Sequence, residues 1–169
     1  MPDFTRGSKL HIVLADDHAL LRSAWKSLIN SQPDMEVVGE ADNGRTAVEA
    51  AILLKPACVV MDASMPEMDG VAATKWLATS LPEVTVVALT GHQDQGLLWQ
   101  FLSAGAAGYV LKHSDPQQLL QAIRTVSSGG MFIDAGISSN RYRNPRLTCD
   151  LAIRCANHDA ADPHPGCAT

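Results

Sequence analysis

The sequence predicts an α/β fold in which a doubly wound, five-stranded parallel sheet is covered by five helices. Short apolar runs rich in β-branched residues alternate five times with segments of helical spacing, as expected for successive strand–helix units. The runs are almost continuously apolar, which is typical of strands buried on both faces of a parallel sheet. Turn signals such as Asn43-Gly44 and Leu81-Pro82 separate the strands from the helices.

Each element can be placed along the chain. The expected strands are LHIVLA (10–15), MEVVGEA (35–41), ACVVMD (57–62), TVVALT (85–90) and GYVLK (108–112). The expected helices span 19–31, 44–54, 70–81, 95–103 and 116–126. The first helix is expected to pack on the sheet through one apolar face, formed by Leu20, Leu21, Trp25, Leu28 and Ile29. The last helix has a clear start, because Asp115 suits a cap and Pro116 suits the first turn.

Length and composition set the domain boundaries. The 169 residues, 46% of them hydrophobic, suffice for one domain with a substantial core. We expect this domain at 9–130, after an N-terminal extension at 1–8 and before a linker and irregular tail at 131–169, which shows no sustained period from Ser138 onward. The tail contains possible zinc ligands whose spacing matches no strong zinc template: Cys149, Cys155, His158, His164 and Cys167.

Charge and hydropathy exclude several classes of function. The net charge of −5 gives no electrostatic reason to expect nucleic-acid binding by the chain as a whole. No apolar run is long enough to cross a bilayer, and the first residues lack the pattern of a secretory signal. With four cysteines and no such signal, we expect a cytoplasmic protein without a disulfide framework.

Polar residues follow the expected strands at their carboxyl ends. Asp16 and Asp17 follow the first strand, Asp62 ends the third, Thr90 the fourth and Lys112 the fifth. In a parallel sheet these ends meet at one edge, where ligands bind. Three crowded carboxylates repel one another, and Mg²⁺ (or Mn²⁺) would relieve that conflict. The hydroxyl and the ammonium suit a phosphoryl group, and the central carboxylate suits an aspartyl-phosphate nucleophile.

This ordered set, with Met65-Pro66 and Asp69-Gly70 after Asp62, resembles the receiver domain of two-component response regulators. The segment YVLKHSDPQQLLQAIRTVSSGG (109–130) is similar to the NarL/FixJ subgroup, whose receivers precede a LuxR-type DNA-binding domain. The resemblance covers roughly 9–130. It implies a flavodoxin-like sheet with strand order 2-1-3-4-5.

The resemblance also implies roles for individual residues. Asp62 would accept phosphate from a phosphohistidine on a sensor histidine kinase. The metal would be bound by Asp17 and Asp62, by the backbone carbonyl of Ser64, and by Asp16 through water.

Three further residues would respond to the phosphoryl group. Lys112 would pair with a phosphoryl oxygen, Thr90 would swing toward the phosphate, and Tyr109 would turn inward behind it. The result would be a phosphorelay module that switches a protein-interaction surface and turns over no outside substrate. The partner would be the kinase, and homodimer formation stays open.

Alternative interpretations remain for single residues. Asp16 and Asp17 could cap the first helix, and Asp69-Gly70 is interpreted as a cap of the third. Tyr109 could serve as core packing rather than as a switch. His92 is interpreted as an exposed loop residue that could influence access of water to the phosphate, as that position does in the similar family.

Alternative functions are also open. A LuxR-type transcription regulator would need an output domain; Arg146-Leu147-Thr148 stands where one would open, and the pattern then stops. We therefore expect a truncated or frame-shifted end, no DNA-binding residues, and no DNA binding by this chain. A magnesium-dependent phosphatase generally places a second aspartate two residues after the nucleophile, where this chain has Ser64. A stand-alone receiver acting through its fourth and fifth helices would use the same site.

Overall fold

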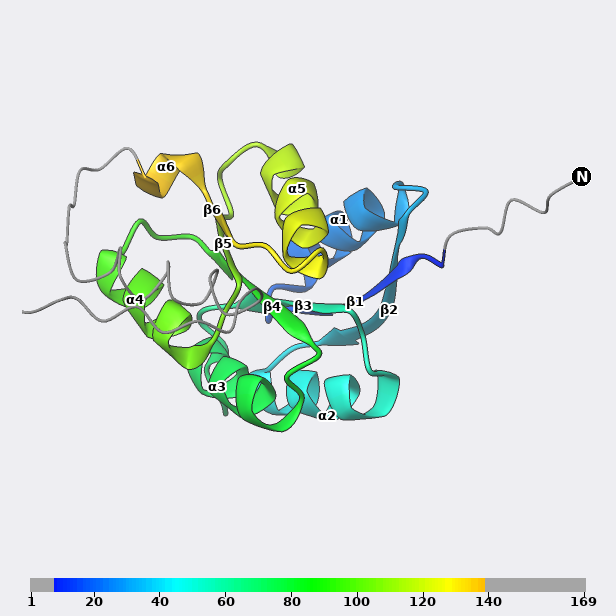
Figure 1. Cartoon of the computed structure of the whole chain (residues 1–169), viewed down its shortest axis with the longest axis horizontal. Helices are drawn as coiled ribbons and strands as arrows, with labels where there is room; N and C mark the ends of the chain where they lie inside the picture. Colours follow the sequence, from blue (N-terminus) through cyan, green and yellow to red (C-terminus); the bar gives the residue numbers. More distant parts are fainter. Residues whose placement is uncertain (1–7, 139–169) are drawn as a thin grey trace, which may run out of the picture. The chain divides into compact units, whose positions relative to one another are not determined.

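A six-stranded parallel sheet forms the centre of the described part of the chain (Figure 1). The computed structural model describes residues 8–138. The strands are β1 (Leu10–Ala15), β2 (Met35–Ala41), β3 (Cys58–Asp62), β4 (Thr85–Thr90), β5 (Gly108–Leu111) and β6 (Phe132–Ile133). Their order is β2-β1-β3-β4-β5-β6, and every neighbouring pair is parallel.

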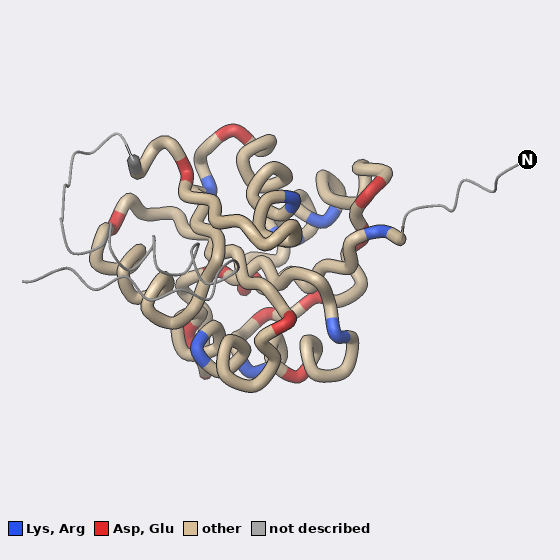
Figure 2. Tube along the Cα trace, in the orientation of Figure 1, with Lys and Arg blue, Asp and Glu red and all other residues tan. Residues whose placement is uncertain are grey.

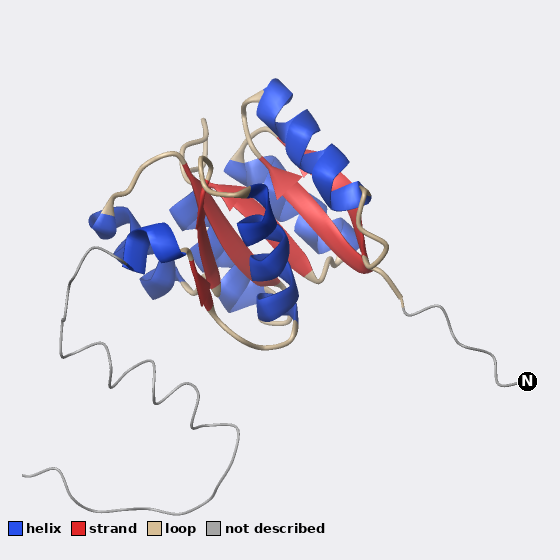
Figure 3. Cartoon of the chain, turned by 90° about the horizontal axis from the view of Figure 1, so that it is seen from above, coloured by secondary structure: helices blue, strands red, loops and turns tan. Residues whose placement is uncertain are grey.

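Helices cover both faces of the sheet (Figures 1 and 3). They are α1 (Ala19–Asn30), α2 (Gly44–Leu54), α3 (Gly70–Ser80), α4 (Gln95–Ala104), α5 (Pro116–Ser127) and α6 (Ala135–Ser138). One buried cluster joins the sheet to α1 and α5, and the other joins it to α2, α3 and α4. The predicted flavodoxin-like α/β fold and the order of its first five strands are therefore confirmed.

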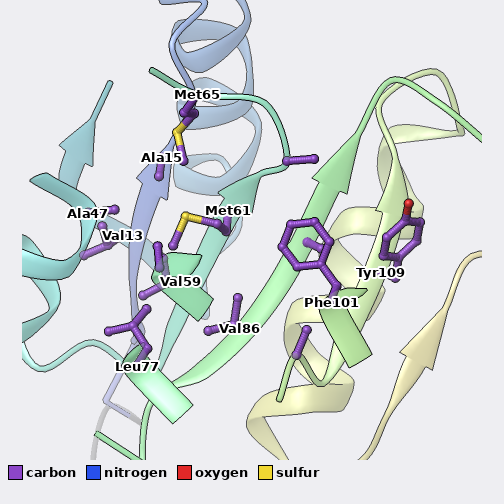
Figure 4. Packing of buried hydrophobic residues seen from close by; sticks show 14 of the residues in the cluster. Val13, Ala15, Ala47, Val59, Met61, Met65, Leu77, Val86, Phe101 and Tyr109 are labelled. Carbon is purple, nitrogen blue, oxygen red and sulfur yellow. The ribbon is translucent and has the colours of Figure 1, made fainter. Parts of the chain in front are cut away.

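The core on the α2–α3–α4 face consists mainly of interlocking aliphatic side chains (Figure 4). Val13, Val59 and Met61 project from the central strands and are fully buried. Leu77 of α3 packs in the same cluster. Burial of each side chain of this size contributes about 1.5–3 kcal/mol relative to exposure, so the apolar strands hold the sheet rigid beneath its carboxyl-end edge.

Side-chain caps set where several helices begin. Asn43 accepts a hydrogen bond from the Thr46 amide at 2.8 Å, and Asp69 accepts one from the Ala72 amide at 2.8 Å. Asp115 caps α5, as its position before a proline predicted. Each such cap contributes about 1 kcal/mol. The interpretation of Asp69 as a structural cap of the third helix is confirmed.

The predicted apolar face of α1 is partly wrong. Trp25 and Ile29 are buried, but Leu20 is 84% exposed and Leu21 is 38% exposed. Leu20 precedes Trp25 by five positions, which at about 100° per residue places it roughly 140° around the helix from that side chain. Apolar composition in the first turn was therefore a poor guide to contact with the sheet.

The sixth strand and α6 were not predicted, because residues 131–169 were expected to form a linker and irregular tail. β6 has two residues and pairs with β5, with Gly108 opposite Phe132 and Tyr109 opposite Ile133. So short a strand carries no detectable hydrophobic period. Residues 1–7 of the expected N-terminal extension and residues 139–169 of the expected tail lie outside the described residues.

Charged residues are spread over several helices and loops of the described part (Figure 2). None of its helices is both long and apolar enough to cross a membrane.

Candidate functional site

The candidate site lies at the carboxyl ends of four neighbouring strands. Asp16 and Asp17 follow β1, and Asp62 is the last residue of β3. Thr90 ends β4, and Lys112 follows β5 directly. Because β1, β3, β4 and β5 are adjacent and parallel, these residues share one edge of the sheet. The sequence predicted that these residues would follow strands that end at the same edge.

The Lys112 ammonium joins two of the carboxylates. Its Nζ lies 3.0 Å from Asp16 Oδ2 and 3.0 Å from Asp62 Oδ2. Both aspartates are buried, and the Lys112 side chain is only 15% exposed. One positive charge therefore faces two buried negative charges, which leaves the site with an excess of negative charge.

Burial and charge pairing shift the pKa values of both Asp62 and Lys112. Burial raises the pKa of the Asp62 carboxyl to about 6, although the Lys112 ammonium acts in the opposite direction. Burial lowers the pKa of Lys112, but its pairing with Asp16 and Asp62 outweighs that effect and leaves this pKa above its ordinary value. At neutral pH the arrangement therefore holds an ionised nucleophile candidate against a charged ammonium.

Asp17 completes the acidic cluster and brings His18 into it. The Asp17 side chain is about one-third exposed, and its Oδ1 lies 3.0 Å from His18 Nδ1. Possible ligand atoms of Asp16, Asp17, His18 and Asp62 all lie within 4.8 Å of one another. Carboxylate oxygens at this spacing, with net negative charge, suit a hard divalent cation such as Mg²⁺ or Mn²⁺. The sequence reasoning missed His18, although its place next to the acidic pair was a usable signal.

The helix-cap alternative for Asp16 and Asp17 is wrong. The N-cap of α1 is His18, whose side chain makes no capping hydrogen bond. Asp16 Oδ1 accepts a hydrogen bond from the His18 amide at 2.8 Å, and the Asp16 carbonyl accepts one from Arg22 Nη1 at 2.6 Å. These bonds fix the turn that presents both carboxylates to the sheet edge.

The loop after β3 lies tightly against Asp62. The Ser64 amide donates a hydrogen bond to Asp62 Oδ1 at 3.3 Å, so the Ser64 backbone lies beside the carboxylate. A Cβ on Gly70 would overlap the Asp62 carbonyl oxygen. The start of α3 can therefore lie this close to Asp62 only with glycine at position 70. Glu67 adopts a left-handed conformation with φ of 64°, which tightens the same loop.

Thr90 and Tyr109 lie on β4 and β5, the two strands that follow β3 in the sheet. Thr90 is buried, and its hydroxyl accepts a hydrogen bond from the His92 amide at 3.2 Å. Tyr109 is fully buried and meets Phe101 edge-on, with ring centroids 6.0 Å apart (Figure 4). Burial raises the pKa of Tyr109 to about 12. Its hydroxyl makes no well-formed hydrogen bond in the described part of the chain, although the Thr90 hydroxyl is near enough to act against the rise in pKa.

The structure therefore brings together Asp16, Asp17, Asp62, Ser64 and Lys112. Thr90 ends the neighbouring strand β4, and Tyr109 lies in β5 beside it. His92 is exposed, as interpreted from the sequence. The cysteines and histidines considered as zinc ligands lie outside the described residues. Asp134, which is 2% exposed, was not singled out in the sequence at all.

The chain is similar in sequence to a known protein family and to characterised relatives. Residues 12–124 match the family model described as the response regulator receiver domain. The oxygen regulatory protein NreC of Staphylococcus haemolyticus is 37% identical over 154 residues, which cover 90% of this chain and 66% of that protein. The transcriptional regulatory protein DegU of Brevibacillus brevis is 35% identical over 139 residues, covering 82% and 59% respectively.

A solved structure agrees with these sequence matches. A two-component response regulator of the LuxR family from Aurantimonas sp. superposes with a TM-score of 0.75 at 32% identity, covering 78% of this chain and 94% of that chain. The chain spans less than two-thirds of the length of the two curated relatives, 66% and 59%.

Proposed function

Because this chain belongs to the response regulator receiver domain family, we propose that its Asp62 carboxylate accepts a phosphoryl group from a phosphohistidine of a sensor histidine kinase. The proposal rests chiefly on the Lys112 ammonium, which lies 3.0 Å from both Asp16 and Asp62 at the common edge of the sheet. A phosphoryl group on Asp62 would bring negative oxygens to a place where a positive charge is already held.

The transfer can be written for the residues of this chain. An Asp62 carboxylate oxygen attacks phosphorus, a P–O bond forms, and the P–N bond to the donor histidine breaks, with its electron pair leaving on the imidazole. Lys112 neutralises charge on the phosphoryl oxygens, so the residues act by position and charge. With a pKa of about 6, Asp62 is mostly ionised and able to attack at neutral pH.

A divalent cation would complete this arrangement. Bound Mg²⁺ or Mn²⁺ would supply positive charge to the phosphoryl oxygens, held by Asp17, Asp62 and the Ser64 carbonyl, and by Asp16 through water. The close spacing of the carboxylates supports this assignment, since possible ligand atoms of three aspartates and His18 lie within 4.8 Å of one another.

The response to phosphorylation would start at Thr90 and Tyr109. Thr90 would give up the hydrogen bond from the His92 amide and donate its hydroxyl hydrogen to a phosphoryl oxygen. The Tyr109 ring packs against Phe101, and its hydroxyl lies near the Thr90 hydroxyl, so its packing would respond to that movement. A surface of α4, β5 and α5 would thereby take one of two arrangements.

The wider role follows from the same proposal. The chain would act in the cytoplasm as a phosphorelay component and turn over no outside substrate. Similarity to a LuxR-family regulator suggests a transcriptional output for longer relatives. For this chain, DNA binding would depend on residues after 138, and no observation among the described residues favours it.

Intact-mass measurement after incubation with acetyl phosphate and Mg²⁺ tests the proposal. The native chain is expected to gain one phosphoryl group, and Asp62→Asn is expected to gain none. Asp69→Asn is a matched control, because Asp69 is an exposed carboxylate of the same loop that caps α3. Equal labelling of native protein and Asp62→Asn would refute the assignment.

A further inference from the structure

The segment after α5 returns to the sheet and lies along β5 (Figure 1). We call residues 132–138 the β6–α6 segment. The Phe132 amide donates to the Ala107 carbonyl at 3.0 Å, and the Asp134 amide donates to the Tyr109 carbonyl at 2.9 Å. These bonds attach the segment to the strand that carries Tyr109 and leads into Lys112.

Asp134 makes the most unusual contact in this segment. Its carboxylate is buried, with the residue only 2% exposed. Oδ2 accepts a hydrogen bond from the Leu111 amide at 3.1 Å, and Oδ1 accepts one from the Gly136 amide at 2.8 Å. The side chain thus continues the β5–β6 ladder beyond the last paired backbone groups. A buried carboxylate is costly without such bonds, so its position is closely defined.

The Leu111 amide lies one residue before the phosphate-contacting lysine. The Lys112 amide donates to the Thr90 carbonyl at 2.7 Å, on the opposite side of β5. The end of β5 is therefore held from two sides, by Thr90 of β4 and by the Asp134 carboxylate. From this fixed point the Lys112 side chain reaches Asp62.

Packing reinforces the same connection. Ile137 of α6 is buried in the apolar cluster that contains Tyr109 and Leu111. A Cβ on Gly136 would lie 3.2 Å from Leu111 Cδ1, which shows how closely α6 approaches the end of β5.

We propose that Asp134 is a positioning residue for phosphoryl transfer, whose carboxylate fixes the Leu111–Lys112 end of β5 and so keeps the Lys112 ammonium against Asp62. The β6–α6 segment then belongs to the phosphoryl-acceptor unit and is more than a linker leading out of the domain. This inference rests on the proposed function, since it concerns the group that Lys112 would contact.

The test compares two aspartates whose carboxylates each accept a hydrogen bond from the amide two residues later in the chain. Asp134→Ser keeps a short acceptor near the Gly136 amide but is too short to reach the Leu111 amide. Asp115→Ser makes the same change at the cap of α5, where Asp115 accepts a hydrogen bond from the Gln117 amide at 2.9 Å and makes none of the β5–β6 hydrogen bonds. Asp134→Asn retains the side-chain volume and one oxygen acceptor, and it serves as the second variant if Asp134→Ser does not fold.

Phosphorylation by acetyl phosphate with Mg²⁺ should be about tenfold slower in Asp134→Ser, because small displacements of a positioned charge cost large factors in rate. Asp134→Asn should lie between that variant and the native chain, and Asp115→Ser should match the native rate. Amide hydrogen exchange separates positioning from general destabilisation. Exchange at Leu111 should accelerate in Asp134→Ser, whereas the amides of Val59 and Val60 in β3 should keep their protection.

The outcomes distinguish this inference from the proposed function. A native chain that takes up no phosphate overturns the proposed function itself. If the native chain is phosphorylated, and Asp134→Ser and Asp134→Asn are phosphorylated as fast as the native chain, only the role of Asp134 is overturned. Equal slowing in Asp134→Ser and Asp115→Ser, with faster exchange throughout β3, would also contradict it, because the effect would then be general destabilisation.

Discussion

Asp62 ends an otherwise apolar strand. Its burial raises the pKa of the carboxyl and makes the ionised form unfavourable in the folded chain. The carboxylate is 3% exposed and shares one ammonium with Asp16. Burial raises its pKa to about 6, so the ionised form is disfavoured compared with the unfolded chain. The ionised carboxylate therefore lowers the stability of the folded chain.

Asp62→Asn is accordingly expected to be more stable than the native chain at neutral pH when metal is removed. The folded pKa of about 6 lies above the ordinary value of 3.8, so the native state binds this proton more tightly than the unfolded state. The stability contributed by Asp62 thus falls as pH rises through that interval, by on the order of 1–3 kcal/mol.

Urea denaturation in EDTA between about pH 4 and pH 7 measures this difference. The native and variant curves should converge at the acidic end and separate toward neutral pH. A native chain as stable as Asp62→Asn at neutral pH would show that the charged carboxylate is not disfavoured.

Tyr109 allows a second test with single substitutions. Its buried hydroxyl lacks a well-formed hydrogen bond, so Tyr109→Phe should leave the free energy of unfolding unchanged or raise it by up to about 1 kcal/mol. Tyr109→Ala, which also removes the ring packed on Phe101, should cost about 3–5 kcal/mol. Loss of more than about 1 kcal/mol in Tyr109→Phe, measured in urea, would mean that the hydroxyl has a strong partner.

Among the helices and strands, the close contact between α3 and β3 positions the loop beside Asp62. Gly70→Ala should be strongly destabilising, by about 1–3 kcal/mol, because the new Cβ would overlap the Asp62 carbonyl oxygen and force the backbone to move. Gly91→Ala is a matched control, since a Cβ there meets no atom within 4 Å. Urea midpoints measure both variants, and similar midpoints would contradict the tight packing of α3 on β3.

The helices and strands also show where sequence reasoning succeeds. Strands such as β3 and β4 were predictable because buried parallel strands are apolar on both faces. The period of α1 did not show that Leu20 faces away from the sheet, since neighbouring apolar residues blur the edge of a helical face. β6 was missed because two residues have no period, and its place depends on pairing with a strand about 24 residues earlier in the chain.

In the described part of the chain as a whole, the candidate site could be predicted because its residues follow strands of one parallel sheet. The topology alone brings Asp16, Asp62 and Lys112 together, although they are far apart in sequence. The contact of Asp134 with Leu111 could not be predicted in this way. It depends on a side chain that replaces a backbone acceptor, and neither composition nor spacing indicates such a bond.

Metal binding should stabilise the folded chain as a whole. Mg²⁺ at ten times its dissociation constant should raise the free energy of unfolding by about 1.4 kcal/mol, because the acidic cluster exists only in the folded state. Asp17→Asn should lose most of this gain. Asp34→Asn, which removes an exposed carboxylate paired with Arg124, should keep it. Urea denaturation with and without Mg²⁺ measures the effect, and an equal gain in both variants would place the metal elsewhere.

The most direct measurement is to locate the phosphate in the chain. Tandem mass spectrometry of peptides, prepared after brief treatment with acetyl phosphate and Mg²⁺, identifies the modified side chain. Phosphate is expected on Asp62 and should be lost when Mg²⁺ is withheld. Phosphate on another residue of the native chain, with Asp62 unmodified, would contradict it.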